Sequence, residues 1–448
     1  MTDYYVRPVN GDDTNGGTGP SNAWKTFFSP TDHDNTRGGT YNCADVHAGD
    51  RVFLWAEGTT GGEANVNFQW WFPSVLGSVA LIGANADGVV DGTRYSIYVA
   101  PGWVSWYNQQ QGASSYSQYY PELTTSTMGN VKYAMIYQNL HWSEMKVLDS
   151  SQALNYGGIY FAGSCSSPTV LENCEFGPYL GDTNGHTWPY FNRWGGSIVL
   201  IGCYIHDSTR SGTGVVTDPT MIGCHVKNVK ATVRIPAYGR FHMINNVIEG
   251  HDGNGVFQLD NASGNYNAPH VVANNVFYNN DGPVFKYNDD AAHSRTAYYN
   301  NVFDSNEACF DANSLTLTFC DFGLHSNVFK NNTNILINAG ISFDEFAAIG
   351  AGAGGSGGYG TLGGENNQLT GTVNYSNAAT GDYRLKRSSS VKESGWNFDT
   401  AGFGLAPFSA SYSGRLSLGT GGVGDEVTVS GRSYKKYSSS PPVWRRIP

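Results

Sequence analysis

Three nine-residue stretches near the middle of the chain decide the fold: VANNVFYNN (272–280), YYNNVFDSN (298–306) and LHSNVFKNN (324–332). Each stretch has apolar-leaning residues, an Asn-ending turn, two more apolar residues and a second polar turn. Each copy begins 26 residues after the one before it. Self-similarity at a fixed period of this length indicates a repeat architecture in which each unit stacks on its neighbours.

The pattern continues toward the N-terminus with lower fidelity, in MINNVIEGH (243–251), MIGCHVKNV (221–229), LIGCYIHDS (200–208) and LENCEF (171–176). Weaker copies are LIGAN from Leu81 and IYQNLHW from Ile136. One position, here called the pivot, is Asn or Cys in every clear copy. The pivots are Cys174, Cys203, Cys224, Asn246, Asn275, Asn301 and Asn327. We expect them to stack as one buried structural column, with the Asn side chains forming a hydrogen-bonded ladder.

Each repeat holds three short β-like runs separated by Gly, Asn or Asp, and it shows neither a helical period nor regularly spaced Leu. Three such strands and their turns make one coil of a right-handed parallel β-helix. About ten to twelve coils at ~4.8 Å would form a rod roughly 50 Å long. At the pivot, we expect the chain to turn through the left-handed conformation, which Asn tolerates. The predicted fold is therefore all-β.

Composition agrees with this fold and excludes several function classes. The 57 Gly among 448 residues disfavour a helical protein, and 14% aromatic residues disfavour bulk disorder. A formal charge of −11 argues against nucleic acid or anionic membranes as partners. Because no apolar run approaches ~18 residues, no membrane insertion is expected. The first twenty residues lack a secretion signal, so we expect folding in a cytosol unless a leader was removed.

The sequence contains no residue spacing that is typical of a metal or cofactor site. The seven Cys form no CxxC or zinc pattern, and no dense acidic calcium loop is present. GAGGSG (352–357) matches a nucleotide-binding string, but neither a helix pattern nor a phosphate-binding Lys follows it. We therefore expect no metal, no cofactor, and reduced, buried thiols.

Three segments outside the repeats point to a family. Residues 4–27 (YYVRPVNGDDTNGGTGPSNAWKTF) resemble the N-terminal segment of pectate-lyase-like right-handed β-helix proteins. HAGDRVFLWAEGTT (47–60) resembles that family's first coil, and GDYRLKRSSS (381–390) its exit segment. With the coils, the resemblance covers about residues 1–395. It implies the fold but leaves the activity open, because the superfamily includes lyases, hydrolases, epimerases and phage tailspikes.

The predicted organisation has four parts: an N-terminal cap (1–45), the β-helix (46–345), a Gly-rich segment and exit (346–412), and a basic tail with a hairpin (413–448). Two aromatic insertions, 98–122 and 181–196, interrupt the coils. Their aromatic side chains can stack on sugar rings, or they can pack over the side of the helix. The candidates for glycan binding are Trp103, Trp106, Tyr107, Trp188, Tyr190 and Trp194.

A line of polar residues offers a candidate site on the first strand of each coil. We align 231–235, 255–259, 283–287 and 308–312, which turns Val233, Phe257, Phe285 and Phe310 inward. The outward residues, here called the polar stripe, are then Arg234, Gln258, Lys286 and Asp311, with Asp260 one step further along.

The polar stripe fits two reactions and one simpler role. Arg234 and Lys286 could neutralise a uronic acid and remove its proton, as a polysaccharide lyase requires. Asp260 and Asp311 could serve a glycoside hydrolase, although their two-coil separation is near the upper limit for such a pair. Gln258 would bind the glycan. The alternative is a solvated sheet face without catalysis.

Three functions remain open. The first is a bacteriophage virion protein, such as a tailspike, fibre or surface spike, that binds host surface polysaccharide and contacts other virion proteins. It would be a homotrimer assembled in the host cytoplasm. The second is a stand-alone polysaccharide lyase or glycoside hydrolase, which would be secreted. The third is a non-catalytic structural decoration protein. We favour the first, with degradation of the glycan left open.

Overall fold

The structure is a computed structural model, and its folded framework covers most of the repeats. The residues described are 1–25, 46, 49–57, 80–99, 135–144, 160–161, 169–177, 190–191, 198–208, 213–215, 219–230, 232–236, 241–253, 255–260, 269–287, 295–311, 321–325, 327–338, 375–377, 382–385, 426–429, 432–439 and 442–446. None of the helices in these ranges has the length and apolar character of a membrane span. The predicted insertion residues Trp103, Trp106, Tyr107, Trp188 and Trp194 lie outside these ranges.

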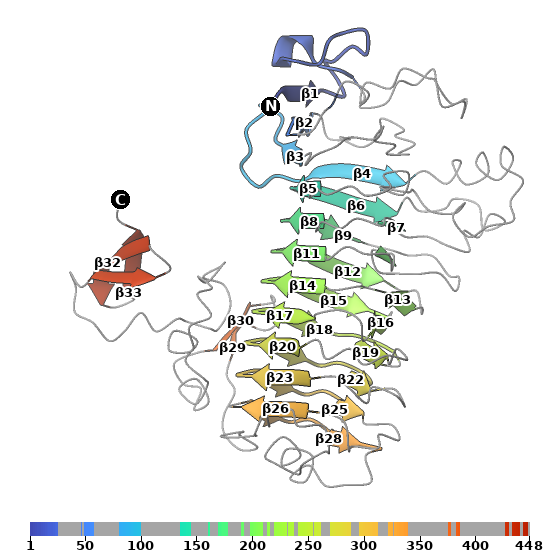
Figure 1. The fold of residues 1–448 in the computed structure, drawn as a ribbon, viewed down its shortest axis with the longest axis vertical. Helices are drawn as coiled ribbons and strands as arrows, with labels where there is room; N and C mark the ends of the chain where they lie inside the picture. The colour runs from blue at the N-terminus through green and yellow to red at the C-terminus, as the bar shows by residue number, and fades with distance from the viewer. Residues whose placement is uncertain are drawn as a thin grey trace, which may run out of the picture.

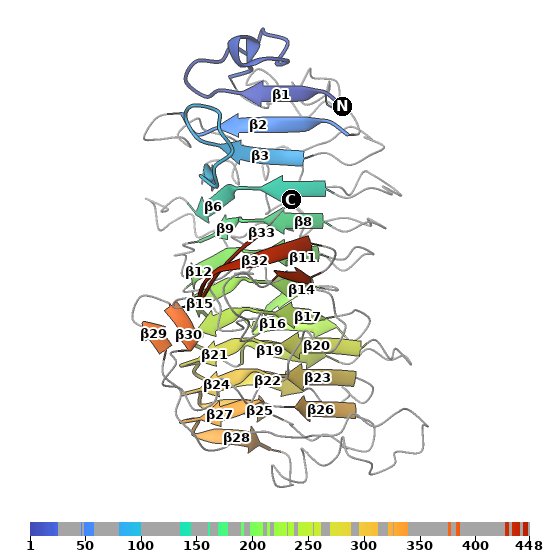
Figure 2. The same ribbon diagram turned by 90° about the vertical axis from the view of Figure 1, so that its left-hand side faces the viewer.

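Three parallel sheets make up the framework within the described ranges (Figures 1 and 2). The eleven-stranded sheet contains β1 (Asp3–Val6), β2 (Arg51–Trp55), β3 (Ala80–Ala84), β5 (Met135–Gln138), β8 (Thr169–Glu172), β11 (Ile198–Ile201), β14 (Pro219–Ile222), β17 (His242–Ile244), β20 (Pro269–Ala273), β23 (Arg295–Tyr299) and β26 (Asp321–His325). The nine-stranded sheet contains β4 (Tyr95–Val99), β6 (Leu140–Glu144), β9 (Glu175–Phe176), β12 (Tyr204–Ser208), β15 (His225–Val229), β18 (Val247–Glu249), β21 (Val276–Tyr278), β24 (Val302–Asp304) and β27 (Val328–Lys330). The six-stranded sheet contains β13 (Thr213–Val215), β16 (Thr232–Pro236), β19 (Phe257–Asp260), β22 (Pro283–Tyr287), β25 (Ala308–Asp311) and β28 (Asn334–Ile337).

Successive strands along the chain belong to different sheets, and the chain returns to each sheet one coil later. Thus β17, β18 and β19 form one circuit, and β20, β21 and β22 form the next, each strand pairing in parallel with its counterpart. This topology confirms the predicted right-handed parallel β-helix. The eleven strands of the longest sheet agree with the expected ten to twelve coils.

Aromatic side chains fill the interior in stacks that follow the helix axis. Phe257, Phe285 and Phe310 stack with ring centroids 5.5 and 6.1 Å apart. A second stack runs through Phe277, Phe303 and Phe329, with centroids 4.8 and 5.0 Å apart. Since each buried aromatic removes ~150–250 Å² from water, these stacks stabilise the fold coil by coil.

The pivots form a buried column at the corner between the eleven- and nine-stranded sheets. Asn275 Nδ2 donates to Asn301 Oδ1, and Asn301 Nδ2 donates to Asn327 Oδ1, both at 2.9 Å. Each pivot also donates to a carbonyl of the preceding coil, as Cys224 Sγ does to Leu200 O and Asn246 Nδ2 does to Met221 O. The thiols therefore continue the asparagine ladder, and burial raises the pKa of Cys174 and Cys224.

The left-handed residue of this corner is the one before the pivot, so our prediction for the pivot itself was wrong. Asn245, Asn274 and Asn300 have φ of 58°, 57° and 52°, and Gly202 and Gly223 have φ of 60° and 62°. The preceding residue turns the chain at the surface, which leaves the pivot side chain free to point into the core. Sequence reasoning also missed a second ladder at the next corner, formed by Asn280, Asn306 and Asn332.

The N-terminal segment closes the interior at the first coil. β1 is already the first strand of the eleven-stranded sheet, and the short 3₁₀ helix η1 (Pro20–Asn22) leads to Trp24. Tyr4 and Trp24 are buried and stack 4.9 Å apart. Gly17, with φ of 73°, crosses the Trp24 ring so closely that a Cβ would lie 2.2 Å from it. Only glycine fits this crossing.

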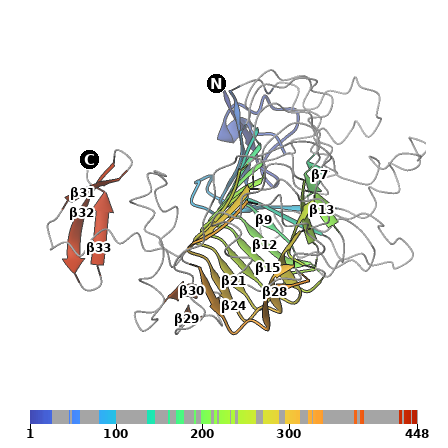
Figure 3. The same ribbon diagram turned by 60° about the horizontal axis from the view of Figure 1, so that its bottom comes forward.

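A hairpin from the exit segment covers part of the nine-stranded sheet's outer face. β29 (Tyr375–Asn377) and β30 (Asp382–Leu385) pair antiparallel and lie beside β21 and β24 (Figure 3). Four valines on this outer face are buried, although the alternation of side chains along each strand points them away from the interior of the β-helix. This valine column is Val247, Val276, Val302 and Val328, and Tyr278 and Tyr375 pack on it.

Two small sheets complete the described part. β7 (Tyr160–Phe161) and β10 (Tyr190–Phe191) pair in parallel, so Tyr190 lies in a strand and not in the loop we expected. In the tail, β31 (Glu426–Val429), β32 (Arg432–Ser439) and β33 (Pro442–Arg446) form an antiparallel sheet.

Candidate functional site

The polar stripe has the register that the sequence predicts. Arg234 pairs with Gln258, Gln258 with Lys286, and Lys286 with Asp311 across neighbouring strands of the six-stranded sheet. The intervening residues Val233, Phe257, Phe285 and Phe310 are buried. Gln258 and Lys286 are half-buried, as expected for outward positions on a sheet. Their proposed binding and catalytic roles stay predictions.

One carboxylate of the polar stripe, that of Asp311, is buried. Asp311 is only 6% exposed, and its Oδ1 accepts a hydrogen bond of 3.0 Å from Asn338 Nδ2. Asp260 ends β19 beside Pro236 of β16. Asp311 is therefore hydrogen-bonded to the following coil, and the catalytic roles suggested for Asp260 and Asp311 stay predictions.

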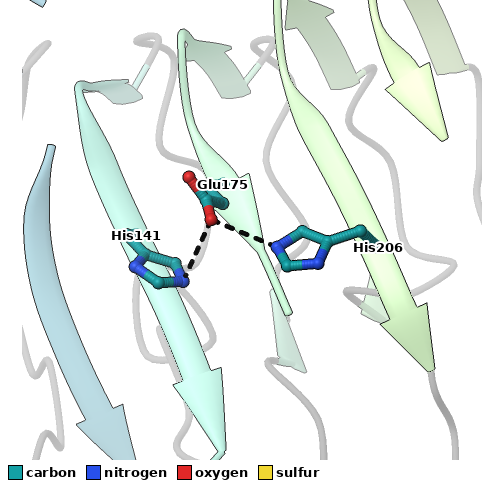
Figure 4. Close-up of side chains that lie close together, drawn as sticks. All are labelled: His141, Glu175 and His206. Carbon is teal, nitrogen blue, oxygen red and sulfur yellow. Dashed lines mark hydrogen bonds and ion pairs between the residues drawn. The ribbon is translucent and has the colours of Figure 1, made fainter. Parts of the chain in front are cut away.

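A second group of polar side chains lies on the outer face of the nine-stranded sheet. The histidine–glutamate cluster consists of His141 on β6, Glu175 on β9 and His206 on β12 (Figure 4). His141 pairs with Glu175, which pairs with Tyr204, so three consecutive coils contribute. His206 lies two residues beyond Tyr204 and stacks on its ring at 4.2 Å.

The two histidines approach the same carboxylate oxygen. Glu175 Oε1 lies 3.1 Å from His206 Nε2 and 3.5 Å from His141 Nε2. The other oxygen, Oε2, forms an ion pair with Arg94, whose remaining nitrogens donate to Asn173 O and Asn173 Oδ1. Arg94 therefore fixes the carboxylate and leaves Oε1 directed at the histidines.

Neighbouring groups hold both histidine rings in place. His206 Nδ1 lies 2.9 Å from Asp207 Oδ2, and Asp207 Oδ1 accepts from Asn228 Nδ2. His141 Nε2 lies 2.7 Å from Gly177 O. A Cβ on Gly177, which has φ of 130°, would lie 2.1 Å from His206 O, so only glycine permits this packing.

The electrostatics of the cluster favour a charged carboxylate beside a charged imidazole. Burial alone would raise the pKa of Glu175, but the hydrogen bond from His206 and the charges of His141 and Arg94 lower it to about 2. Burial alone would lower the pKa of His206, but its hydrogen bonds to Glu175 and Asp207 raise it overall. Hydrogen bonds and opposite charges therefore outweigh the effect of burial on the pKa of both groups.

A related pair occurs one coil further along the same face. His225 Nε2 lies 2.8 Å from Glu249 Oε1, and Lys227 Nζ lies 3.2 Å from the same oxygen. This pair has one histidine where the cluster has two, and a lysine occupies the second position. It resembles the cluster in geometry without offering three metal-ligating side chains.

Sequence reasoning missed the cluster, although the signal was present. Aligned on the pivot, His141, Glu175 and Tyr204 each follow the pivot position directly, and His206 comes two residues later. The weak copy IYQNLHW hides this alignment because Leu140 occupies its pivot.

Comparisons with known proteins do not assign this chain to a family. No family model matches this chain, and no curated protein matches it. Among solved structures, the chain is similar to a GH136 lacto-N-biosidase from Eubacterium ramulus. That match has 11% identity and a TM-score of 0.39, and it covers 82% of this chain and 67% of the other.

Proposed function

We propose that this protein binds host surface polysaccharide through the polar stripe, as an attachment protein of a bacteriophage virion. The observation that carries the proposal is the strand register. Arg234, Gln258 and Lys286 occupy equivalent register positions on three adjacent strands. Such strands are ~4.8 Å apart, which is close to the repeat of one sugar ring along a glycan chain.

The residue types suit an acidic polysaccharide. Lys and Arg form charge-assisted hydrogen bonds with carboxylates, and Gln can both donate to and accept from hydroxyl groups. The stripe lies on a stacked, hydrogen-bonded framework, so its spacing is fixed before the ligand arrives. Preorganisation of this kind reduces the entropic cost of binding a flexible chain.

Binding to capsular or lipopolysaccharide preparations from the host tests the proposal. Lys286→Ala should weaken binding about tenfold or more in biolayer interferometry, because it removes one charged hydrogen bond. Lys330→Ala is the matched control, since Lys330 is a half-buried lysine on a strand of the nine-stranded sheet. Equal binding by Lys286→Ala and the wild type would contradict the proposed surface.

The same incubations distinguish binding from degradation. Absorbance from an unsaturated uronide would reveal a lyase, and new reducing ends without that absorbance would reveal a hydrolase. An unaltered polysaccharide agrees with attachment alone.

The virion role has its own measurements. Mass spectrometry of purified phage particles should detect this chain. Light scattering should give three times the chain mass of 48.4 kDa if the expected homotrimer forms. Absence of the chain from the particles would contradict the virion role and leave polysaccharide binding to be judged by its own assay.

A further inference from the structure

We propose that His141, Glu175 and His206 form a binding site for a borderline divalent metal ion of the Zn²⁺ type. The three ligand atoms lie within 4.8 Å of one another, and the residues come from three adjacent strands of one sheet. The sequence contains no local metal-binding motif here, because each of the three ligands lies more than thirty residues from the next. The site is independent of the polar stripe, which belongs to a different sheet.

The spacing of the ligand atoms fits a metal. In a tetrahedral site with zinc bonds of 2.0–2.2 Å, neighbouring ligand atoms are ~3.4 Å apart. The two histidine-to-Glu175 distances are 3.1 and 3.5 Å. Two of the three distances between ligand atoms are thus close to those of a tetrahedral site, and the third is at most 4.8 Å.

The surrounding hydrogen bonds orient two of the ligands, His206 and Glu175, as metal sites require. Asp207 holds Nδ1 of His206, so Nε2 is the nitrogen directed at Glu175. A carboxylate on the far nitrogen is the usual support of a metal-bound histidine, and Asn228 in turn holds Asp207. Arg94 occupies only Oε2 of Glu175, which leaves Oε1 for one metal bond.

The donor set selects the class of metal. Two imidazoles and one carboxylate suit Zn²⁺ and similar ions, whereas Mg²⁺ and Ca²⁺ prefer oxygen ligands alone. On binding, the metal would replace the contact between His141 Nε2 and Gly177 O. The three side chains are 22%, 20% and 11% exposed for His141, Glu175 and His206, so solvent can supply a remaining ligand.

Calorimetry with untagged, EDTA-treated full-length protein tests the site. ZnCl₂ should bind saturably at one ion per chain, while MgCl₂ and CaCl₂ should not. Co²⁺ should give the intense visible spectrum of a tetrahedral complex. His141→Ala and His206→Ala should each weaken Zn²⁺ binding by at least about 100-fold, because each removes a ligand.

Two further variants protect the test against misfolding. Asp207→Asn keeps all three ligands and should weaken Zn²⁺ binding about 10- to 100-fold through loss of support for His206. His225→Ala is the matched control, because His225 also bonds a glutamate on this face, and it should bind Zn²⁺ like the wild type. Lack of saturable binding by the wild type, or wild-type affinity in Asp207→Asn or in the His141→Ala/His206→Ala double variant, would overturn the proposal.

Discussion

In the corners formed by two neighbouring asparagines, the first residue makes the turn and the second is the buried pivot. Asn300 takes the left-handed conformation, with φ of 52°, and Asn301 is fully buried in the ladder. Asn301 Nδ2 donates to Val272 O and Asn327 Oδ1, and its Oδ1 accepts from both nitrogens of Asn275. The buried amide therefore satisfies backbone and side-chain groups of the preceding coil and a side chain of the following coil.

At this scale, Asn301→Ala should be far more destabilising than Asn300→Ala. The first change leaves several buried donors and acceptors unpaired, each costing ~1–3 kcal/mol, so we expect a loss of about 3 kcal/mol or more in unfolding free energy. The second mainly forces Ala into the left-handed region, at about 1 kcal/mol. Urea unfolding monitored by circular dichroism measures both. Equal losses would show that the ladder contributes no more than the turn.

At the scale of the elements, the outer face of the nine-stranded sheet changes from polar to apolar along the helix axis. One outward line begins with His141, Glu175, Tyr204 and His225 and continues as the valine column. The change from polar to apolar residues coincides with the part that the β29–β30 hairpin covers. Tyr375 packs edge-on against Tyr278, with ring centroids 5.8 Å apart. The hairpin thus protects an apolar surface that solvent would otherwise reach.

Tyr375→Ala should release this hairpin from the sheet. Loss of the aromatic contact and of buried area should cost about 1.5 kcal/mol, which is roughly tenfold in the population of the open hairpin. Cleavage by trypsin after Arg384, in β30, should accelerate by the same factor. Tyr299→Ala, on the eleven-stranded sheet, is the control and should leave that cleavage unchanged. If Tyr375→Ala is cleaved like the wild type, the hairpin is held by other contacts.

At the scale of the whole molecule, each coil contacts mainly the coils before and after it. The stacks of Phe277, Phe303 and Phe329 and the asparagine ladders repeat the same contacts at each step. Stability in such an array is close to a sum of coil and interface contributions. The number of coils is therefore adjustable without a change in the pattern of contacts.

Deletion of one complete coil should leave a folded protein. Removing residues 276–301 joins Asn275 to Val302, so β24 follows β20 in the register that β21 had, and Asn275 meets Asn327 in the ladder. We expect a cooperative thermal transition and a β-type circular dichroism spectrum. Removing residues 289–301 alone breaks the register, and this variant should not fold. Loss of structure in both deletions would contradict the independence of the coils.

Much of the framework could be predicted because its signals are local. Alternation within β19, β22 and β25 assigns Phe257, Phe285 and Phe310 to the core and Gln258 and Lys286 to the surface. The left-handed residue could have been predicted too. Where the pivot is Cys203 or Cys224, the residue before it is Gly, which marks the position that needs positive φ. In the Asn–Asn copies, both residues fit either role.

The sequence by itself determined the repeat, the strand alternation, the buried pivots and the alignment of the polar stripe. Each of these depends on residues within one coil and on the period between coils. Only the tertiary structure decided that His141, Glu175 and His206 converge on one point, and that a hairpin beginning at Tyr375 covers the valine column. Those contacts join side chains from separate coils or from a distant segment. They depend on how segments of unequal length return to the stack, which no local pattern specifies.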